Sequence, residues 1–156
     1  MTTPTPLPIS ASTEIAAAPA EVWAVVSDVT RMPEFSPELR KVIPLGRVRG
    51  LGQTILGLNR RKAVWWPTTS KVVRWEPERV VAWKTRESGA TWSYECEPTE
   101  VDGHPATRLT ATRELDAFTL GSKLMTPILG GAVGHDEELA AGLATTLDRI
   151  KAAVER

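Results

Sequence analysis

Arg113 is the residue whose type and position most directly suggest chemistry on a ligand. It shares an every-second-residue pattern with Thr107, Leu109 and Ala111. Because successive side chains of a β-strand point to opposite faces, the guanidinium should lie on the same face as this mainly apolar row. The planar donor set of arginine can clamp a carboxylate or an enolate of a bound molecule. A structural ion pair with an acid such as Asp116, or a side chain that reaches back to solvent, is the alternative.

The aromatic residues form a second group of candidates, because the chain has six tryptophans but two phenylalanines and one tyrosine. Trp92, Tyr94 and Cys96 alternate with polar residues, which predicts that these three face the interior and the polar set faces water. Trp83 would add a ring to an aromatic wall that suits a flat, partly unsaturated ligand, with ordinary core packing as the alternative. Cys96 is interpreted as a small buried hydrophobic residue.

Trp65 and Trp66 are adjacent, so on a strand only one of them can face the interior. With Val72 taken as an inward position, the same alternation places Trp66, Thr68 and Ser70 inward. This register requires that no β-bulge interrupts the strand between these positions. Trp66 and Thr68 therefore join the candidate ligand contacts.

The predicted ligand-binding set combines these strand residues with two residues that precede the last helix. It comprises Trp66, Thr68, Trp83, Trp92, Tyr94, Arg113, Phe118 and Met125. The catalytic residues are not determined by the sequence, and the candidates are His135, Arg113 and Tyr94. His135 stands beside three acids at the start of the predicted terminal helix and could act as a general acid or base on a bound ligand. A solvated histidine is the alternative.

Several common kinds of site are excluded by the motifs that the sequence lacks. It contains no GxSxG, GK[ST] or GxGxxG pattern, which argues against serine-nucleophile, phosphate-loop and dinucleotide sites. One cysteine forms no internal disulfide and cannot by itself hold a zinc ion. We therefore expect no metal site and no cofactor.

The elements that must position these residues are mostly strands. A first strand is expected at 9–17, then a helix that begins at Pro19 and a second short helix that ends before Pro37. Further strands are predicted at 40–48, 51–59, 63–75, 79–86, 90–98 and 106–114. The turns between them are predicted at Gly50, Asn59-Arg60, Pro77-Glu78, Ser88-Gly89 and Asp102-Gly103. Short connections imply antiparallel neighbours.

A long amphipathic helix is predicted over 134–155, because Leu139, Leu143, Leu147, Ile150 and Val154 recur at helical spacing. A shorter helical piece is predicted around 119–129. Seven strands with two short helices after the first and one long helix after the last make an α+β protein. A strongly twisted sheet that curls around the last helix would leave a cavity between the two.

The composition fits one soluble globular domain with a sizeable core. The chain has 156 residues, of which 42% are hydrophobic and 24% charged. No apolar run is long enough to span a membrane, and the first residues lack the basic and apolar parts of a signal peptide, so a cytoplasmic location is expected. The proline-rich segment 1–8 is predicted to be a flexible tail before a single domain over 9–156.

Net charge is zero, but the two signs are distributed unevenly along the chain. Residues 31–86 contain 13 basic and 4 acidic residues, whereas residues 87–156 contain 6 basic and 12 acidic ones. A basic half can face an anionic partner, and solvated strand faces are the alternative.

Three segments carry a resemblance to a known family: APAEVWAVVSDVTRMPEFSPELRKV, LGLNRRKAVWWPTTSKVVRWEPERVVAWKT and the closing EELAAGLATTLDRIKAA. They resemble the polyketide cyclase/dehydrase-like branch of the START-related (SRPBCC) helix-grip superfamily. The resemblance implies a curved seven-stranded antiparallel sheet around a long C-terminal helix, with two short helices between strands 1 and 2. It does not specify one function, because this fold carries ligand carriers, cyclases, dehydratases and lipid-transfer modules.

Three functions follow from these observations. The first is a carrier or sensor that binds a hydrophobic or aromatic small molecule between the sheet and the terminal helix. The second is a cyclase- or dehydratase-type enzyme in which Arg113 stabilises an enolate and His135 or Tyr94 moves a proton. The third is an interaction module that presents the basic 31–86 half to an anionic partner. We expect a monomer or homodimer, no nucleic acid partner and no membrane insertion.

Overall fold

The computed structural model describes residues 8–46, 49–115 and 132–156, and for residues 132–138 only the backbone. The elements in chain order are β1 (Ile9–Ile15), α1 (Pro19–Val26), η1 (Val29–Glu34), β2 (Leu39–Leu45), β3 (Thr54–Arg61), β4 (Val64–Glu76), β5 (Val80–Thr85), β6 (Ala90–Val101), β7 (His104–Leu115) and α3 (Ala132–Val154). Within the described chain, seven strands form one antiparallel sheet in the order β1-β7-β6-β5-β4-β3-β2.

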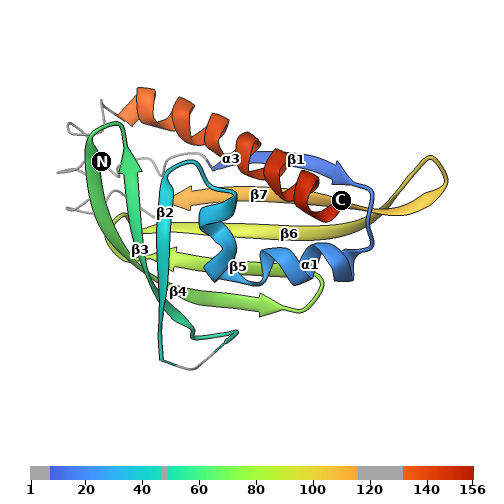
Figure 1. Cartoon of the computed structure of the whole chain (residues 1–156), viewed down its shortest axis with the longest axis horizontal. Helices are drawn as coiled ribbons and strands as arrows, with labels where there is room; N and C mark the ends of the chain where they lie inside the picture. The colour runs from blue at the N-terminus through green and yellow to red at the C-terminus, as the bar shows by residue number, and fades with distance from the viewer. Residues whose placement is uncertain (1–7, 47–48, 116–131) are drawn as a thin grey trace, which may run out of the picture.

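The three helical elements of the described residues lie against the sheet, and α3 runs along it beside β1 and β7 (Figure 1). The short elements α1 and η1 connect β1 to β2, which are the two edge strands of the sheet. The predicted α+β helix-grip architecture, with two short helices between the first and second strands, is therefore confirmed.

Local sequence explains how the two short helices begin. Pro19 occupies the first turn of α1, where its missing N–H group costs no hydrogen bond. Asp28 caps the 3-10 helix η1, since its carboxylate accepts a hydrogen bond from the backbone N–H of Thr30 at 3.2 Å. Pro37 follows η1 and directs the chain into the extended conformation of β2.

The turn between β3 and β4 lies later in the chain than predicted. Asn59 and Arg60 were expected to form it, but they belong to β3 and pair with Trp66 and Trp65 of β4. The chain reverses after Arg61 instead, where Lys62 adopts a left-handed backbone angle of φ 56°. The misplacement arose because asparagine favours turns by local propensity, whereas here its side chain bonds across the strand pair.

Other boundaries differ from the predictions by a few residues. The strand expected over 51–59 begins at Thr54, and that expected over 40–48 ends at Leu45. The β6–β7 hairpin is longer than expected and is closed by Asp102 and Gly103, both with positive φ. The last helix begins at Ala132 and ends at Val154. The short helix expected around 119–129, and all but one residue of the tail 1–8, lie outside the described residues.

The densest core lies where α1 and the second half of α3 cover the sheet. Ile15, Val22, Leu109 and Ile150 have no solvent-exposed surface there. The apolar stripe of the last helix faces this core, because Leu143, Leu147 and Ile150 are all buried. Trp23 of α1 meets Trp75 of β4 edge to face, with ring centroids 5.1 Å apart.

Polar contacts fasten the end of α3 to the first strand. The Nζ of Lys151 donates to the carbonyl of Glu14 at 2.7 Å and to the Glu155 carboxylate at 2.7 Å. The same carboxylate accepts a hydrogen bond from the backbone N–H of Ala16 at 2.8 Å. That backbone donor, together with Lys151, lowers the pKa of Glu155 below its ordinary value. No described helix is both long and apolar enough to pass through a membrane.

Candidate functional site

A cavity of about 550 Å³ lies between the sheet and α3, at the opposite end of α3 from the dense core. Side chains of β3, β4, β5 and β6 form its floor, and η1 and β2 form one side. Leu139, Leu143 and Thr146 of α3 cover it. The volume lies within the range of about 300 to 1,000 Å³ that is usual for small-molecule sites.

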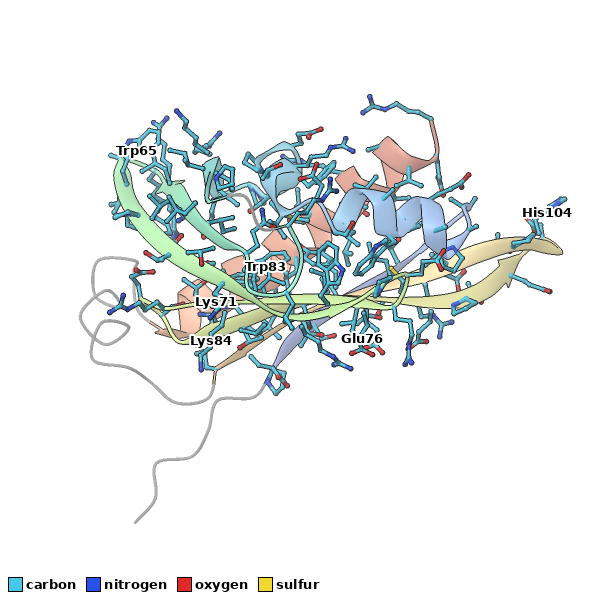
Figure 2. The ribbon with its side chains drawn as sticks, turned by 90° about the horizontal axis from the view of Figure 1, so that it is seen from below. Trp65, Lys71, Glu76, Trp83, Lys84 and His104 are labelled. Carbon is cyan, nitrogen blue, oxygen red and sulfur yellow. The ribbon has the colours of Figure 1, made fainter. Side chains whose placement is uncertain are left out.

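An aromatic wall lines the sheet side of this cavity. Trp83 and Tyr94 stack with their ring centroids 5.6 Å apart and an interplanar angle of 23°. Trp92 is the register partner of Trp83 across β5 and β6, so both rings lie on the same face of the sheet. Trp66 contributes a fourth ring from β4, and Figure 2 shows Trp83 near the middle of the sheet with Trp65 at the far end of the β3–β4 hairpin.

Strand alternation places these rings as the sequence analysis proposed. Trp66, Thr68 and Ser70 all line the cavity, whereas the side chain of Trp65 points out and is 51% exposed. Val72 is buried on the inward face, and the irregularity in β4 comes only after it. The alternation therefore runs unbroken from Trp66 to Val72.

Arg113 lies at the aromatic wall with a guanidinium that is largely removed from water. Arg113 is 9% exposed, and its guanidinium carbon lies 5.5 Å from the centroid of the Trp92 ring. The two residues are register partners across β6 and β7, which explains the contact. A cation over an indole face is stabilised by the ring quadrupole.

The floor of the cavity also contains a small polar cluster. The side-chain amide of Asn59 donates to Thr68 Oγ1 at 3.0 Å and to the carbonyl of Trp66 at 3.4 Å. Ser70 and Thr85 share a hydrogen bond of 2.9 Å between their buried hydroxyls. These groups give the mainly apolar cavity fixed polar positions.

Gly57 leaves room for this cluster. A Cβ at that position would lie 2.7 Å from Thr68 Oγ1 and 3.0 Å from a methyl group of Leu39. Asn59 and Gly57 were missed by the sequence analysis. The signal that would have found them is the alternation of Ile55, Gly57 and Asn59 in a strand extended by two residues.

Burial changes the acid–base character of Tyr94 and Cys96. Loss of solvent raises the pKa of Tyr94 above its ordinary value, so its hydroxyl is a weaker acid than that of a solvated tyrosine and is suited to donate a hydrogen bond. Burial, with a smaller effect of the Glu95 charge, raises the pKa of Cys96 to about 11. Cys96 is thus an unreactive thiol.

The mouth of the cavity carries several charged residues. Arg40 of β2 and Arg60, Arg61 and Lys62 of the β3–β4 hairpin line it, with Glu38 and Glu87 as the described acids.

Six of the predicted ligand contacts lie together around this cavity. They are Trp66, Thr68, Trp83, Trp92, Tyr94 and Arg113. Phe118 and Met125 lie outside the described residues, and His135 belongs to the part of α3 for which only the backbone is described. Across residues 8–46, 49–115 and 139–156, no group of histidine, cysteine and carboxylate side chains could hold a metal ion.

A curved antiparallel sheet that grips a long C-terminal helix over a ligand-sized cavity defines the START-related helix-grip class. The family model described as polyketide cyclase/dehydrase and lipid transport matches residues 7–155, and the chain belongs to that family. Comparison with curated proteins gave no significant match.

Solved structures share the fold at low sequence identity. The Zhui aromatase/cyclase from Streptomyces sp. R1128 superposes with a TM-score of 0.68 at 21% identity, over 96% of this chain and 94% of that chain. A START superfamily protein from Mycobacterium smegmatis gives a TM-score of 0.72 at 14% identity, over 95% and 97%. Truncated norcoclaurine synthase from Thalictrum flavum gives 0.67 at 17% identity, over 99% and 97%. At these identities the likeness establishes the fold alone.

Proposed function

We propose that this protein binds a flat hydrophobic or aromatic small molecule in the cavity between the sheet and α3, as a carrier or sensor. The observation that carries the proposal is the cavity of about 550 Å³ whose wall is built from Trp66, Trp83, Trp92 and Tyr94. Aromatic rings offer a flat ligand large contact area with little loss of side-chain freedom. The proposal includes a single ligand-binding domain over 9–156, a cytoplasmic location and a monomeric or homodimeric state.

Arg113 narrows the class of ligand. Its guanidinium stands over Trp92 in a part of the cavity that is shielded from water, where a charge-assisted hydrogen bond is stronger than at the surface. An aromatic ring system with an acidic or enolisable group fits this combination of ring and cation.

Adjacent tryptophans provide a matched test of the site. The fluorescent probe N-phenyl-1-naphthylamine is flat and uncharged, and its emission rises when it enters an apolar cavity. Trp66→Ala should weaken its binding about tenfold, because a ring contact contributes on the order of 1 kcal/mol or more beyond area burial. Trp65→Ala, which removes an outward ring from the next position, should leave binding unchanged. Equal binding by both variants and the unmodified protein would refute the proposed site.

A cyclase- or dehydratase-type enzyme is a second candidate, and one observation favours it. Tyr94 and Arg113 line the same cavity, so a hydroxyl that can donate a hydrogen bond to a substrate oxygen and a cation that can stabilise an enolate share one space. Enzymes stabilise the transition state more than the substrate. If the protein is an enzyme that acts on a polyketone substrate, Tyr94→Phe should therefore lower kcat far more than it raises the dissociation constant. A carrier shows no turnover with that substrate, with or without the substitution.

A further inference from the structure

Among the described residues, the large exposed apolar side chains lie in one part of the chain. Within the described residues, all of the large hydrophobic side chains that are substantially exposed lie between Ile43 and Val73. They belong to β2, β3, β4 and the connection between β2 and β3. Surface leucines are ordinary when scattered, but their confinement to three neighbouring strands calls for an explanation.

The same three strands carry much positive charge and one negative charge, since Glu76, the last residue of β4, is their single acid and is paired with Arg74. From Leu39 to Trp75 the sequence contains nine lysines and arginines and no aspartate or glutamate. The basic half noted in the sequence is therefore concentrated in one end of the sheet, because β2, β3 and β4 are consecutive neighbours at its edge.

The register of the paired strands places these apolar side chains on the face of the sheet that is opposite to the cavity, which we call the outer face. Ile43 pairs with Leu56, Leu58 pairs with Pro67, and the next outward pair is Arg60 with Trp65. Directly paired residues project to the same side of a sheet, and this side is opposite to that of Trp66 and Gly57, which line the cavity. We call Ile43, Leu45, Leu56, Leu58, Trp65 and Pro67 the outer apolar strip.

Cations flank this strip on the same face. Lys41 is the register partner of Leu58, and Lys71 is the partner of Thr54 beside Leu56. The guanidinium of Arg60 lies over the Trp65 ring at 5.1 Å and is held there by a hydrogen bond of 2.8 Å to the carbonyl of Lys62. Figure 2 shows Trp65 and Lys71 on this hairpin, with Trp65 at its outer end.

We propose that the outer face of β2, β3 and β4 docks on the surface of an anionic lipid bilayer. Aliphatic and tryptophan side chains enter the interfacial region of a bilayer, and lysine and arginine beside them attract acidic headgroups. The contact is peripheral, since the strip lies on the face of a folded sheet.

Other occupants fit this face less well. A symmetric second copy would bring the same cations against one another, since a two-fold interface places one surface patch against itself. Nucleic acids are bound mainly through phosphates and stacked bases, and this binding makes little use of an aliphatic row. The face is the outside of a curved sheet, and a fluid bilayer adapts to such a surface more readily than a rigid partner does.

The location of the outer apolar strip near the cavity also relates to the proposed ligand binding. The Arg60–Lys62 turn that ends the outer apolar strip also contributes to the lining of the cavity. A hydrophobic ligand could then pass between bilayer and cavity over a short path. This consequence rests on the proposed ligand binding, whereas docking itself does not.

Sedimentation of the full chain with vesicles tests the docking. Vesicles of phosphatidylcholine with about one third phosphatidylglycerol should retain the protein at low salt, and vesicles of phosphatidylcholine alone should not. High salt should release it. Lys41→Gln with Lys71→Gln should lower the partition coefficient about 30-fold, given the usual contribution of each lysine near an anionic surface. Arg79→Gln with Arg156→Gln removes two exposed charges outside the strip and should have no such effect.

A second pair of variants tests the apolar part. Leu56→Ser with Leu58→Ser should also reduce vesicle binding at least about tenfold and leave the binding of N-phenyl-1-naphthylamine unchanged, so that failure of docking and failure of the cavity proposal can be told apart. Full retention by this variant would overturn the proposal in favour of a purely electrostatic surface. No binding to anionic vesicles, or a dimer in light scattering that the leucine variant converts to monomer, would also overturn it.

Discussion

At the scale of single residues, Tyr94 offers a direct measurement, because it is the only tyrosine in the chain. It is buried at the aromatic wall, where desolvation disfavours the charged phenolate and raises the pKa. Absorbance of tyrosinate near 295 nm therefore reports on this one cavity residue.

We predict that the folded protein shows no tyrosinate signal at pH 10 to 11, whereas the chain in guanidinium titrates near the ordinary value of about 10. The pKa of Tyr94 is higher in the folded protein than in the unfolded chain. Its contribution to the free energy of unfolding is therefore fully present below the unfolded pKa and is lost as pH rises above that value. Circular dichroism at each pH should confirm that the fold persists. A native midpoint near 10 would mean that Tyr94 is solvated.

The role of Arg113 can be separated from the shape of the cavity by two probes with the same rings. We predict that Arg113→Met weakens binding of 1-anilinonaphthalene-8-sulfonate at least about tenfold, because a charge-assisted hydrogen bond contributes roughly 1.5 to 3 kcal/mol. Binding of uncharged N-phenyl-1-naphthylamine should change less than about twofold.

Arg79→Met is the control for this pair, since it removes an exposed arginine that is not part of the cavity wall. If Arg113→Met weakened both probes equally, the side chain would be shaping the cavity rather than binding the anion. If it weakened neither probe, Arg113 would not face the ligand.

At the scale of elements, α3 is held by packing at one end and covers the cavity at the other. Leu147 and Ile150 pack into the core, whereas Leu139 and Thr146 line the cavity. The same helix thus contributes both to stability and to the site. A substitution at Leu147 or Ile150, which pack into the core and do not line the cavity, should act mainly on stability.

We predict that Leu147→Ala lowers the free energy of unfolding by about 2 to 5 kcal/mol, since the side chain is fully buried and its removal leaves a void. Asp148→Ala at the adjacent exposed position should change it by less than about 0.5 kcal/mol. Urea denaturation followed by circular dichroism measures both. A similar small change in the two variants would contradict the packing of this stripe against the sheet.

At the scale of the whole molecule, the sheet has two differently built ends. The end under α1 is packed with residues such as Ile15 and Leu109, whose side chains have no solvent-exposed surface. The strands β2, β3 and β4 line one part of the cavity with their inner face and carry the outer apolar strip on their other face, whereas β5, β6 and β7 supply Trp83, Trp92, Tyr94 and Arg113. From Leu39 to Trp75 the sequence contains no acidic residue. The proposed docking surface and part of the proposed ligand site therefore lie on opposite faces of the same three strands.

Local sequence patterns predicted the order of the described elements and which residues of a strand share a face. Alternation identified Trp66, Tyr94 and Arg113 as inward residues, because the two-residue period of a strand is a local property of the backbone. The apolar spacing of α3 predicted its buried stripe for the same kind of reason. The family resemblance supplied the arrangement of these elements in space.

Which of the inward residues lie around one cavity depends on contacts between strands and helices that are distant in sequence. Trp92 meets Trp83 and Arg113 because β5, β6 and β7 pair in one particular register, and Asn59 joins the cavity because β3 extends past the predicted turn. The division between packed core and open cavity likewise depends on where α1, η1 and α3 cover the sheet. These are contacts between residues distant in sequence, and local propensity carries no information about them.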